Sequence, residues 1–253
     1  MIKEDQFKNF IKDVTKEFSG WNFSLIAGTG RMRSSLLPWS YGSLAIPLIQ
    51  NASAMLDMGT GGGELLSMFR PFPCSVFATE GYKPNVEIAK VNLEPLEITV
   101  VPIEEDSDLP FHDKQFNLIL NQHESYSPKE VRRIIQENGT FLTQQVGGLD
   151  CIEINKALNA SVNKEFENWN LTTALQELKM NKFEILYSHE EFPIQRFYDV
   201  GALVYYLKAI PWQVPDFSIE KYEENLYKIH KNIQSKGFYD VKQHRFIIKA
   251  RAI

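Results

Sequence analysis

The fold of this chain is indicated most directly by the segment Ala54-Met-Leu-Asp57-Met-Gly59-Thr-Gly61-Gly62-Gly63-Glu64. A short apolar run ends in an acid and passes into a glycine-dense turn, and Leu65 to Phe69 then read as the opening of a helix. Glycine allows positive φ angles and lets a ligand touch the main chain where a Cβ would collide. The segment therefore predicts a strand, a turn and a helix, with a turn built for the close approach of a ligand.

Two kinds of ligand use such a turn. A dinucleotide prefers Gly-x-Gly-x-x-Gly, with its pyrophosphate on the helix N-terminus. Here the spacing is Gly59-x-Gly61-x-Gly63, and Asp57 precedes it. A carboxylate is badly placed beside a pyrophosphate but can pair with a cationic amino acid portion. The segment resembles motif I of the class I S-adenosylmethionine (SAM) dependent methyltransferases, E/D-x-G-x-G-x-G.

Composition limits the classes of function. The chain has 253 residues, of which 43% are hydrophobic and 23% charged, and this fits one large domain with added segments. Its net charge of −5 disfavours nucleic acid as a partner, because the overall field repels a phosphate backbone. The two cysteines, Cys74 and Cys151, are isolated, so we expect buried thiols, no disulfide framework and no metal site.

Targeting signals are not expected. The N-terminus alternates charged and apolar residues without the apolar region of a secretory signal. The longest apolar run, Val200 to Leu207, is shorter than the roughly 20 residues that cross a bilayer. We therefore expect a cytoplasmic protein that does not enter a membrane.

After the glycine turn the chain alternates strands and helices, which is typical of a parallel sheet with crossovers. Further strands are predicted at residues 75–80, 97–102, 116–120, 140–148, 183–189 and 243–250. Helices are predicted at residues 3–18, 42–50, 84–93, 129–136, within 151–181, from 200 to 207 after a cap at Asp199, and at 219–234.

This order predicts an α/β fold, a Rossmann-like, seven-stranded, mostly parallel sheet with helices on both faces. The resemblance to the methyltransferases implies that the last strand is antiparallel, between the fifth and sixth. The predicted parts are an N-terminal helical and aromatic lid segment (1–50), a SAM-binding core (51–190), a helical cap insertion (191–242) and the final core strand (243–253).

The second predicted strand ends at Glu80, 21 residues after Gly59. A carboxylate there, at the carboxyl end of a strand, can accept both ribose hydroxyls of a bound nucleoside, in SAM and NAD enzymes alike. The segment from Glu105 through Leu109-Pro-Phe111 also resembles small-molecule methyltransferases, in which an acid four residues before Leu-Pro-Phe takes the adenine amino group. This implies that Glu105 has that role, with Asp106 beside it. Together the resemblances predict a cofactor-binding set of Asp57, Gly59, Thr60, Gly61, Glu80, Gly81, Glu105, Asp106 and Asn121.

Polar residues follow the fourth predicted strand directly, in the run Asn121 to Tyr126. They are placed to face the transferred methyl group. His123, with Glu124 beside it, is the candidate general base for a protonated acceptor. The alternative is that His123 is a hydrogen-bonded loop residue. Gln144, in the polar part of the predicted fifth strand, either orients the substrate through its amide or has only an edge-strand role.

Aromatic residues provide the candidates for substrate binding. Trp39 and Tyr41 either line the cofactor entrance or pack against the N-terminal helix. The insertion, with Tyr205 and Trp212, is predicted to cap the carboxyl ends of the strands; the alternative is an extra packing layer.

The sequence thus predicts a methyltransferase that moves a methyl group from SAM to a small, partly apolar acceptor, leaving S-adenosylhomocysteine. One alternative is an NAD(P)-dependent oxidoreductase with a Rossmann fold, against which Asp57 and the extra final strand argue. The other is a non-catalytic SAM-fold binding protein. The acceptor atom and the oligomeric state are left open by the sequence.

Overall fold

A computed structural model describes residues 2–12, 23–72 and 75–253. The part of the predicted N-terminal helix from residue 13 to 18, and the prediction for Cys74, lie outside these residues. The chain forms two units, each assembled from separate segments. Unit 1 comprises Met1–Leu37, Gly148–Asn168 and Glu191–His244, and unit 2 comprises Pro38–Gly147, Trp169–Glu190 and Arg245–Ile253.

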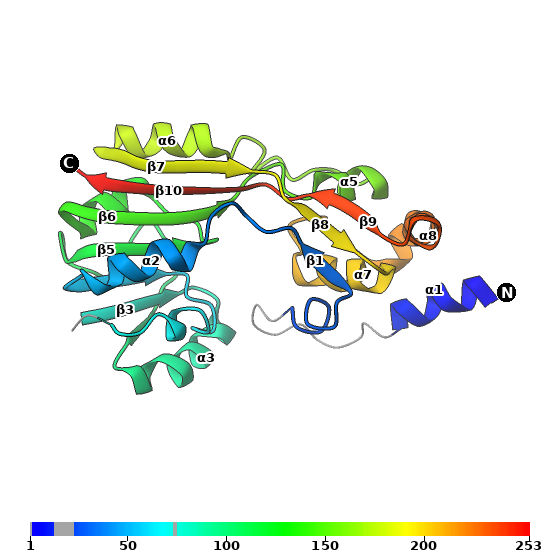
Figure 1. Ribbon diagram of the computed structural model, residues 1–253, viewed down its shortest axis with the longest axis horizontal. Helices are drawn as coiled ribbons and strands as arrows, with labels where there is room; N and C mark the ends of the chain where they lie inside the picture. Colours follow the sequence, from blue (N-terminus) through cyan, green and yellow to red (C-terminus); the bar gives the residue numbers. More distant parts are fainter. Residues whose placement is uncertain (1, 13–22, 73–74) are drawn as a thin grey trace. The chain divides into compact units, whose positions relative to one another are not determined.

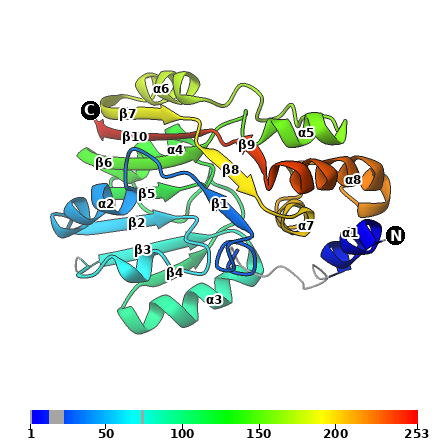
Figure 2. The ribbon, with the colours of Figure 1, turned by 45° about the vertical axis from the view of Figure 1, so that its right-hand side comes forward.

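Unit 2 contains a seven-stranded sheet in the order β4-β3-β2-β5-β6-β10-β7. Its first five strands in that order pair in parallel, and β10 pairs with β6 antiparallel. The last strand therefore lies between the fifth and sixth predicted strands, as expected (Figure 2). The strands are β2 (Ala54–Met58), β3 (Ser75–Glu80), β4 (Thr99–Pro102), β5 (Phe116–Gln122), β6 (Ile135–Val146), β7 (Phe183–Glu191) and β10 (Arg245–Ala252).

Alternate side chains of these strands enter two separate hydrophobic clusters, because successive residues of a strand point to opposite faces. Met55 and Leu118 pack on one face with helices α2 and α3, and Leu56 and Ile119 pack on the other with α4 and α6. Helices therefore cover both faces of the sheet, and the predicted Rossmann-like α/β fold is confirmed (Figure 1). The helices of this unit are α2 (Tyr41–Gln50), α3 (Lys83–Leu93), α4 (Pro128–Ile134) and α6 (Leu171–Met180), with short 3-10 helices at η1 (Leu66–Met68) and η2 (Glu94–Leu96).

The helix predicted to open at Leu65 is wrong: only the single 3-10 turn η1 follows the glycine turn. Pro71 and Pro73 come within five residues of Met68, and a proline lacks an N–H and disfavours the helical conformation of the residue before it. The connection from β2 to β3 therefore has no α-helix in the residues described.

The segment Glu137-Asn-Gly139, which stands between the helix predicted at 129–136 and the strand predicted at 140–148, does not separate two elements. It lies inside β6, between register partners Ile135 and Thr140, and Asn138 has a φ of 62°. The extra residues form an irregularity in the pairing with β5. β6 pairs with β5 at Ile135 and again from Thr140 onward, so the strand resumes its register after residues that locally favour a turn.

Unit 1 combines helices with a second sheet that the sequence patterns did not predict. Its strands β1 (Met32–Ser34), β8 (Ile194–Phe197) and β9 (Tyr239–Lys242) are antiparallel, in the order β1-β8-β9. The segment 191–242 is therefore not purely helical. The helices are α1 (Ile2–Lys12), α5 (Ile152–Leu158), α7 (Val200–Ala209) and α8 (Ile219–Lys236).

Helix α7 forms the centre of the hydrophobic core of unit 1. Asp199 caps it by accepting a hydrogen bond from the N–H of Ala202, as predicted, and nine of its ten residues are buried. Cys151 belongs to the same buried cluster. Within the described residues, no helix combines the length and the apolar composition that a membrane crossing requires.

Candidate functional site

The glycine turn follows β2 in unit 2, and three of its residues have positive φ angles: Gly59 (64°), Gly61 (62°) and Gly63 (80°). L-amino acids adopt such angles only at a cost. The N–H of Thr60 donates to the carbonyl of Thr79 at 2.9 Å, so β3 holds the turn in place. The conformation therefore explains why the turn is built from glycine.

Two of these glycines lie against different neighbours. A Cβ added at Gly63 would lie 2.6 Å from Cγ of Leu93, the last residue of α3, so Gly63 permits helix packing. A Cβ added at Gly59 would collide with Cβ and Cγ of Glu124. The turn thus meets the polar segment after β5 at Gly59.

Glu80 ends β3, and only 4% of its surface is exposed. Its Oε1 accepts a hydrogen bond from the N–H of Tyr82 at 2.7 Å. Burial raises the pKa of this carboxyl group, and backbone N–H groups of Tyr82, Gly61 and Gly81 oppose the rise. Glu80 therefore faces the glycine turn. Its buried neighbour Asn85 was not predicted from the sequence. Oδ1 of Asn85 has no hydrogen-bond partner among the described residues.

Asp57 and Tyr41 lie together at the start of the site. Burial raises the pKa of Asp57 to about 7, and the side chain of Thr60 opposes this rise. Burial, and then the charge of Asp57, also raise the pKa of Tyr41, the first residue of α2. The buried hydroxyl of Tyr41 has no hydrogen-bond partner within the described part of the chain. It is a polar group beside Asp57 that a ligand could satisfy.

The acidic loop after β4 turns its two candidate acids in different directions. Glu105 is exposed, and its Oε2 accepts a hydrogen bond from the hydroxyl of Ser107. Asp106 is half-buried and accepts a hydrogen bond from the hydroxyl of Ser125, in the segment after β5. Burial raises the pKa of Asp106. Of the two acids, Asp106 is therefore the one joined to the other candidate residues.

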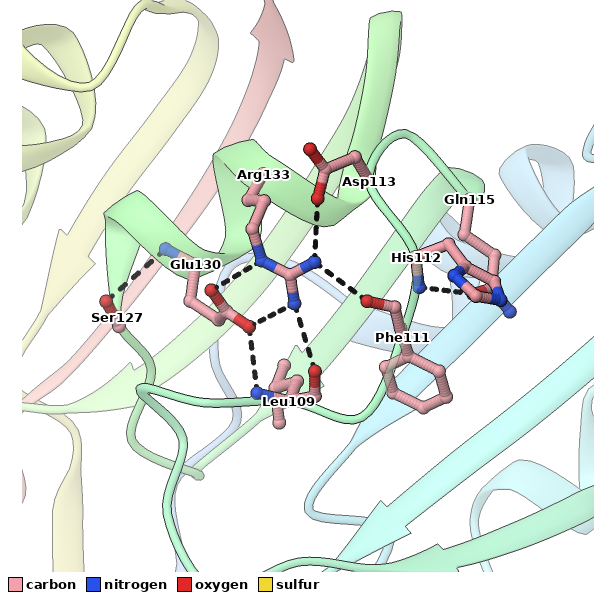
Figure 3. A network of polar contacts seen from close by, with 8 residues as sticks. All are labelled: Leu109, Phe111, His112, Asp113, Gln115, Ser127, Glu130 and Arg133. Atoms are coloured by element: carbon pink, nitrogen blue, oxygen red, sulfur yellow. Dashed lines mark hydrogen bonds and ion pairs between the residues drawn. The ribbon is translucent and has the colours of Figure 1, made fainter.

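Arg133 of α4 forms hydrogen bonds with the segment 109–113, which follows this acidic loop (Figure 3). Its guanidinium donates to the carbonyls of Leu109 (3.0 Å) and Phe111 (2.7 Å), to Asp113 (2.8 Å) and to both carboxylate oxygens of Glu130 (2.5 and 2.9 Å). Glu130 in turn accepts from the N–H of Leu109 at 2.8 Å. No spacing in the sequence singled out Arg133, because its partners come from another segment.

Asn121, at the end of β5, is buried, and its side chain forms hydrogen bonds with other groups of the protein. Its Oδ1 accepts hydrogen bonds from Thr143 (2.9 Å) and Gln145 (2.7 Å), and its Nδ2 donates to the carbonyl of Ser125. Gln145 also donates to the carbonyl of Glu124 at 2.9 Å. This network fixes the segment 122–126 against β6.

Glu124 extends from that segment over Gly59. Burial, and then the charges of Asp106 and Glu80, raise its pKa to about 7. Four carboxyl groups, those of Asp57, Glu80, Asp106 and Glu124, thus gather around the glycine turn. None of the four forms an ion pair with another described residue. The site therefore favours a cation and repels a phosphate.

His123 is bound to β6 through its main chain and its ring. Its φ is 64°, its N–H donates to the carbonyl of Gln144 at 2.7 Å, and its Nε2 lies 2.9 Å from Nε2 of Gln144. Surrounding protein atoms, and then the charge of Arg245, lower the pKa of the imidazole to about 3. The residue as a whole is nevertheless exposed. At neutral pH the ring is uncharged and a weak base.

Trp39 joins this group through Gln144, since its Nε1 donates to Oε1 of Gln144 at 2.7 Å. Tyr205 and Trp212 belong to unit 1, where Tyr205 is buried in the hydrophobic cluster and Trp212 is exposed. Their predicted contact with substrate stays a prediction. Among the described residues no three His, Cys, Asp or Glu side chains come together in an arrangement that could hold a metal ion.

Comparison with known proteins places this geometry in context. Residues 56–145 match the family model described as Methyltransferase domain. No curated protein gives a significant match to the sequence.

Solved structures share the fold. A presumed methyltransferase of Bacillus halodurans C-125 is 17% identical, with a TM-score of 0.57, over 83% of this chain and 98% of its own. A protein of unknown function from Deinococcus radiodurans R1 is 11% identical, with a TM-score of 0.60, over 91% and 97%. Geranyl diphosphate methyltransferase, solved with GPP and sinefungin, is 15% identical, with a TM-score of 0.50, over 83% and 78%.

Proposed function

Since residues 56–145 form a class I SAM-dependent methyltransferase domain, we propose that this enzyme methylates a small, partly apolar acceptor. The observation that carries the choice of ligand is the group of four carboxyl groups without ion-pair partners around the glycine turn. SAM supplies a methyl group on a positively charged sulfur. A site of this charge stabilises such a ligand.

The side chains of the site suit the separate parts of this cofactor. Glu80 and the unpartnered amide oxygen of Asn85 can accept hydrogen bonds from ribose hydroxyls. Asp57 and the unpartnered hydroxyl of Tyr41 can bind the charged amino acid end. Asp106 is the acid we assign to the adenine, in preference to the exposed Glu105.

Methyl transfer requires alignment of the acceptor and exclusion of water rather than a covalent intermediate. Where the acceptor atom carries a proton, we assign its removal to the carboxylate of Glu124. A carboxyl group with a pKa of about 7 is ionised in a large fraction of molecules at neutral pH and is a stronger base than an ordinary glutamate. His123, whose pKa is lowered to about 3, is much less suited to this step.

The alternative of a nicotinamide oxidoreductase is disfavoured by the same features. A pyrophosphate needs the N–H groups and the dipole of a helix N-terminus. The residues described between Gly59 and Phe72 contain only the three-residue η1, and carboxyl groups surround the turn.

Calorimetric titration with SAM tests the proposal. We expect the wild-type protein to bind SAM with a dissociation constant below about 1 mM, in the range usual for enzyme ligands. Glu80→Gln should weaken binding roughly tenfold, because it removes the charge of a buried acceptor. Glu87→Gln is the matched control, since Glu87 is exposed on α3 and pairs only with Lys90.

A thermal-shift assay then compares the melting temperatures of the protein with SAM, with NAD and with NADP. SAM should raise the melting temperature and the two dinucleotides should not. Folded wild-type protein that releases no heat with millimolar SAM, or that binds NAD more tightly, would contradict the assignment. Transfer of a labelled methyl group to members of an acceptor panel then identifies the acceptor.

A further inference from the structure

Three side chains of unit 2 form a continuous hydrogen-bonded chain. Trp39 precedes α2, Gln144 lies on β6, and His123 follows β5. The indole Nε1 of Trp39 lies 2.7 Å from Oε1 of Gln144, and Nε2 of Gln144 lies 2.9 Å from Nε2 of His123. Gln144 itself is buried.

The chemistry of Trp39 fixes the direction of each bond. An indole N–H can only donate, so the group of Gln144 that faces it must be the carbonyl oxygen. The amide nitrogen of Gln144 then faces His123, and an amide NH2 group can only donate. Nε2 of His123 is therefore the acceptor and carries no proton. In a neutral imidazole the proton is then on Nδ1.

The main chain holds the ring in the same place. His123 donates its N–H to the carbonyl of Gln144 at 2.7 Å and has a left-handed φ of 64°. Among the described residues Nδ1 has no hydrogen-bond partner, and the residue is exposed. Arg245 of β10 is the charged neighbour, and its charge disfavours the imidazolium form.

We propose that Trp39 and Gln144 hold His123 as its Nδ1–H tautomer, so that His123 is a hydrogen-bond donor to the methyl acceptor and not a base. Gln144 is a positioning residue, because it acts through His123. This inference rests on the proposed function for the identity of the ligand. It adds a class of acceptor, namely a molecule with an oxygen or nitrogen lone pair close to the atom that is methylated.

The tautomer can be measured without a cofactor or an acceptor. Two-bond proton–nitrogen NMR spectra of protein labelled with 15N histidine distinguish the two neutral tautomers, and the signals of His123 are identified by their loss in His123→Asn. We expect the Nδ1–H pattern in the wild-type protein. Gln144→Glu should move the proton to Nε2, because a carboxylate can only accept from the ring. Trp39→Phe should give a mixture, since the freed amide can rotate.

Gln136→Glu is the matched control, because Gln136 lies on the same strand and bonds only the carbonyl of Gln115. It should leave the His123 signals unchanged. An Nε2–H pattern in the wild-type protein, or an unchanged pattern in Gln144→Glu, would overturn the inference. Calorimetry with SAM on the same proteins reports the proposed function separately. If the wild-type protein did not bind SAM, the proposed function would be contradicted, but the inference about the tautomer would not.

Discussion

At the scale of single residues, the site collects carboxyl groups in an arrangement that costs stability. Burial raises the pKa of Asp57 to about 7. Burial, together with the charges of Asp106 and Glu80, raises the pKa of Glu124 to about 7. Both groups are therefore easier to ionise in the unfolded chain than in the folded protein. Such perturbed groups gather at functional sites, where a ligand offsets their cost.

Glu124→Gln should stabilise the free protein, and the effect should depend on pH. Between about pH 4.5 and 7 the folded state holds a proton on Glu124 that the unfolded state releases, so the stability contributed by this group falls as pH rises. Removing the charge should raise the free energy of unfolding by about 1–3 kcal/mol at pH 8 and by less than about 1 kcal/mol at pH 5. Urea unfolding at the two pH values measures this.

The same substitution should act in the opposite direction on cofactor binding. Loss of one carboxylate near a cationic ligand should weaken SAM binding roughly tenfold. Glu105→Gln, at the exposed neighbouring acid, should change neither stability nor affinity. An equal stabilisation at both pH values would show that Glu124 is not a titrating group of the site.

At the scale of elements, the loops after β4 and β5 are positioned by groups that do not themselves contact a ligand. Arg133 makes five hydrogen bonds and thereby joins α4 to Leu109, Phe111 and Asp113 (Figure 3). Asn121 and Gln145 do the same for the segment after β5. The position of Asp106 and Glu124 thus depends on these neighbouring elements.

Arg133→Lys should loosen the loop between β4 and β5. A lysine has three donors on a flexible chain and cannot reproduce the planar fork that reaches two carbonyls and two carboxylates. We expect a loss of about 1–3 kcal/mol of stability, faster hydrogen exchange in residues 104–113 and weaker SAM binding. Mass spectrometry with hydrogen exchange and calorimetry measure the last two effects.

Arg132→Lys is the control on the same helix. Arg132 pairs with Glu137 and with the carbonyl of Ile253, far along the chain from the acidic loop. Exchange in residues 104–113 should not change. If both substitutions altered this segment equally, the effect would come from α4 as a whole and not from the bonds of Arg133.

At the scale of the whole molecule, two units share one chain that passes between them several times. The site residues from Trp39 to Gln145 belong to unit 2, whereas α7 is in the core of unit 1. The prediction that residues 191–242 cap the site stays a prediction. Each unit has its own hydrophobic core, so the stability of each unit can be tested separately.

Leu203→Ala should destabilise unit 1 and leave the cofactor site intact. Leu203 is fully buried in α7, and removal of such a side chain costs about 2–5 kcal/mol. Hydrogen exchange should quicken in α5, α7 and α8 and not in the strands of unit 2, with SAM affinity unchanged. Ile119→Ala, in the core of unit 2, should show the converse pattern. Equal exchange in both units after either substitution would mean that they unfold as one.

Local patterns of residues were enough to predict most of the elements and the fold class. The glycine turn after β2 needs positive φ angles, Asp199 caps α7, Gly237 ends α8 with a φ of 87°, and the alternation of strands and helices gives the Rossmann-like sheet. These features depend on neighbouring residues, whose spacing the sequence displays directly.

Which side chains meet depends instead on the packing of segments that are distant in the chain. Glu124 lies on Gly59, 65 positions away, Gln144 links Trp39 to His123, and β1 pairs with β8 across more than 150 residues. The run of β6 through Asn138 also differs from local preference, whereas the prolines after Met68 account locally for the missing helix. Contacts between distant segments depend on how whole elements pack, and no local pattern of residues records that packing.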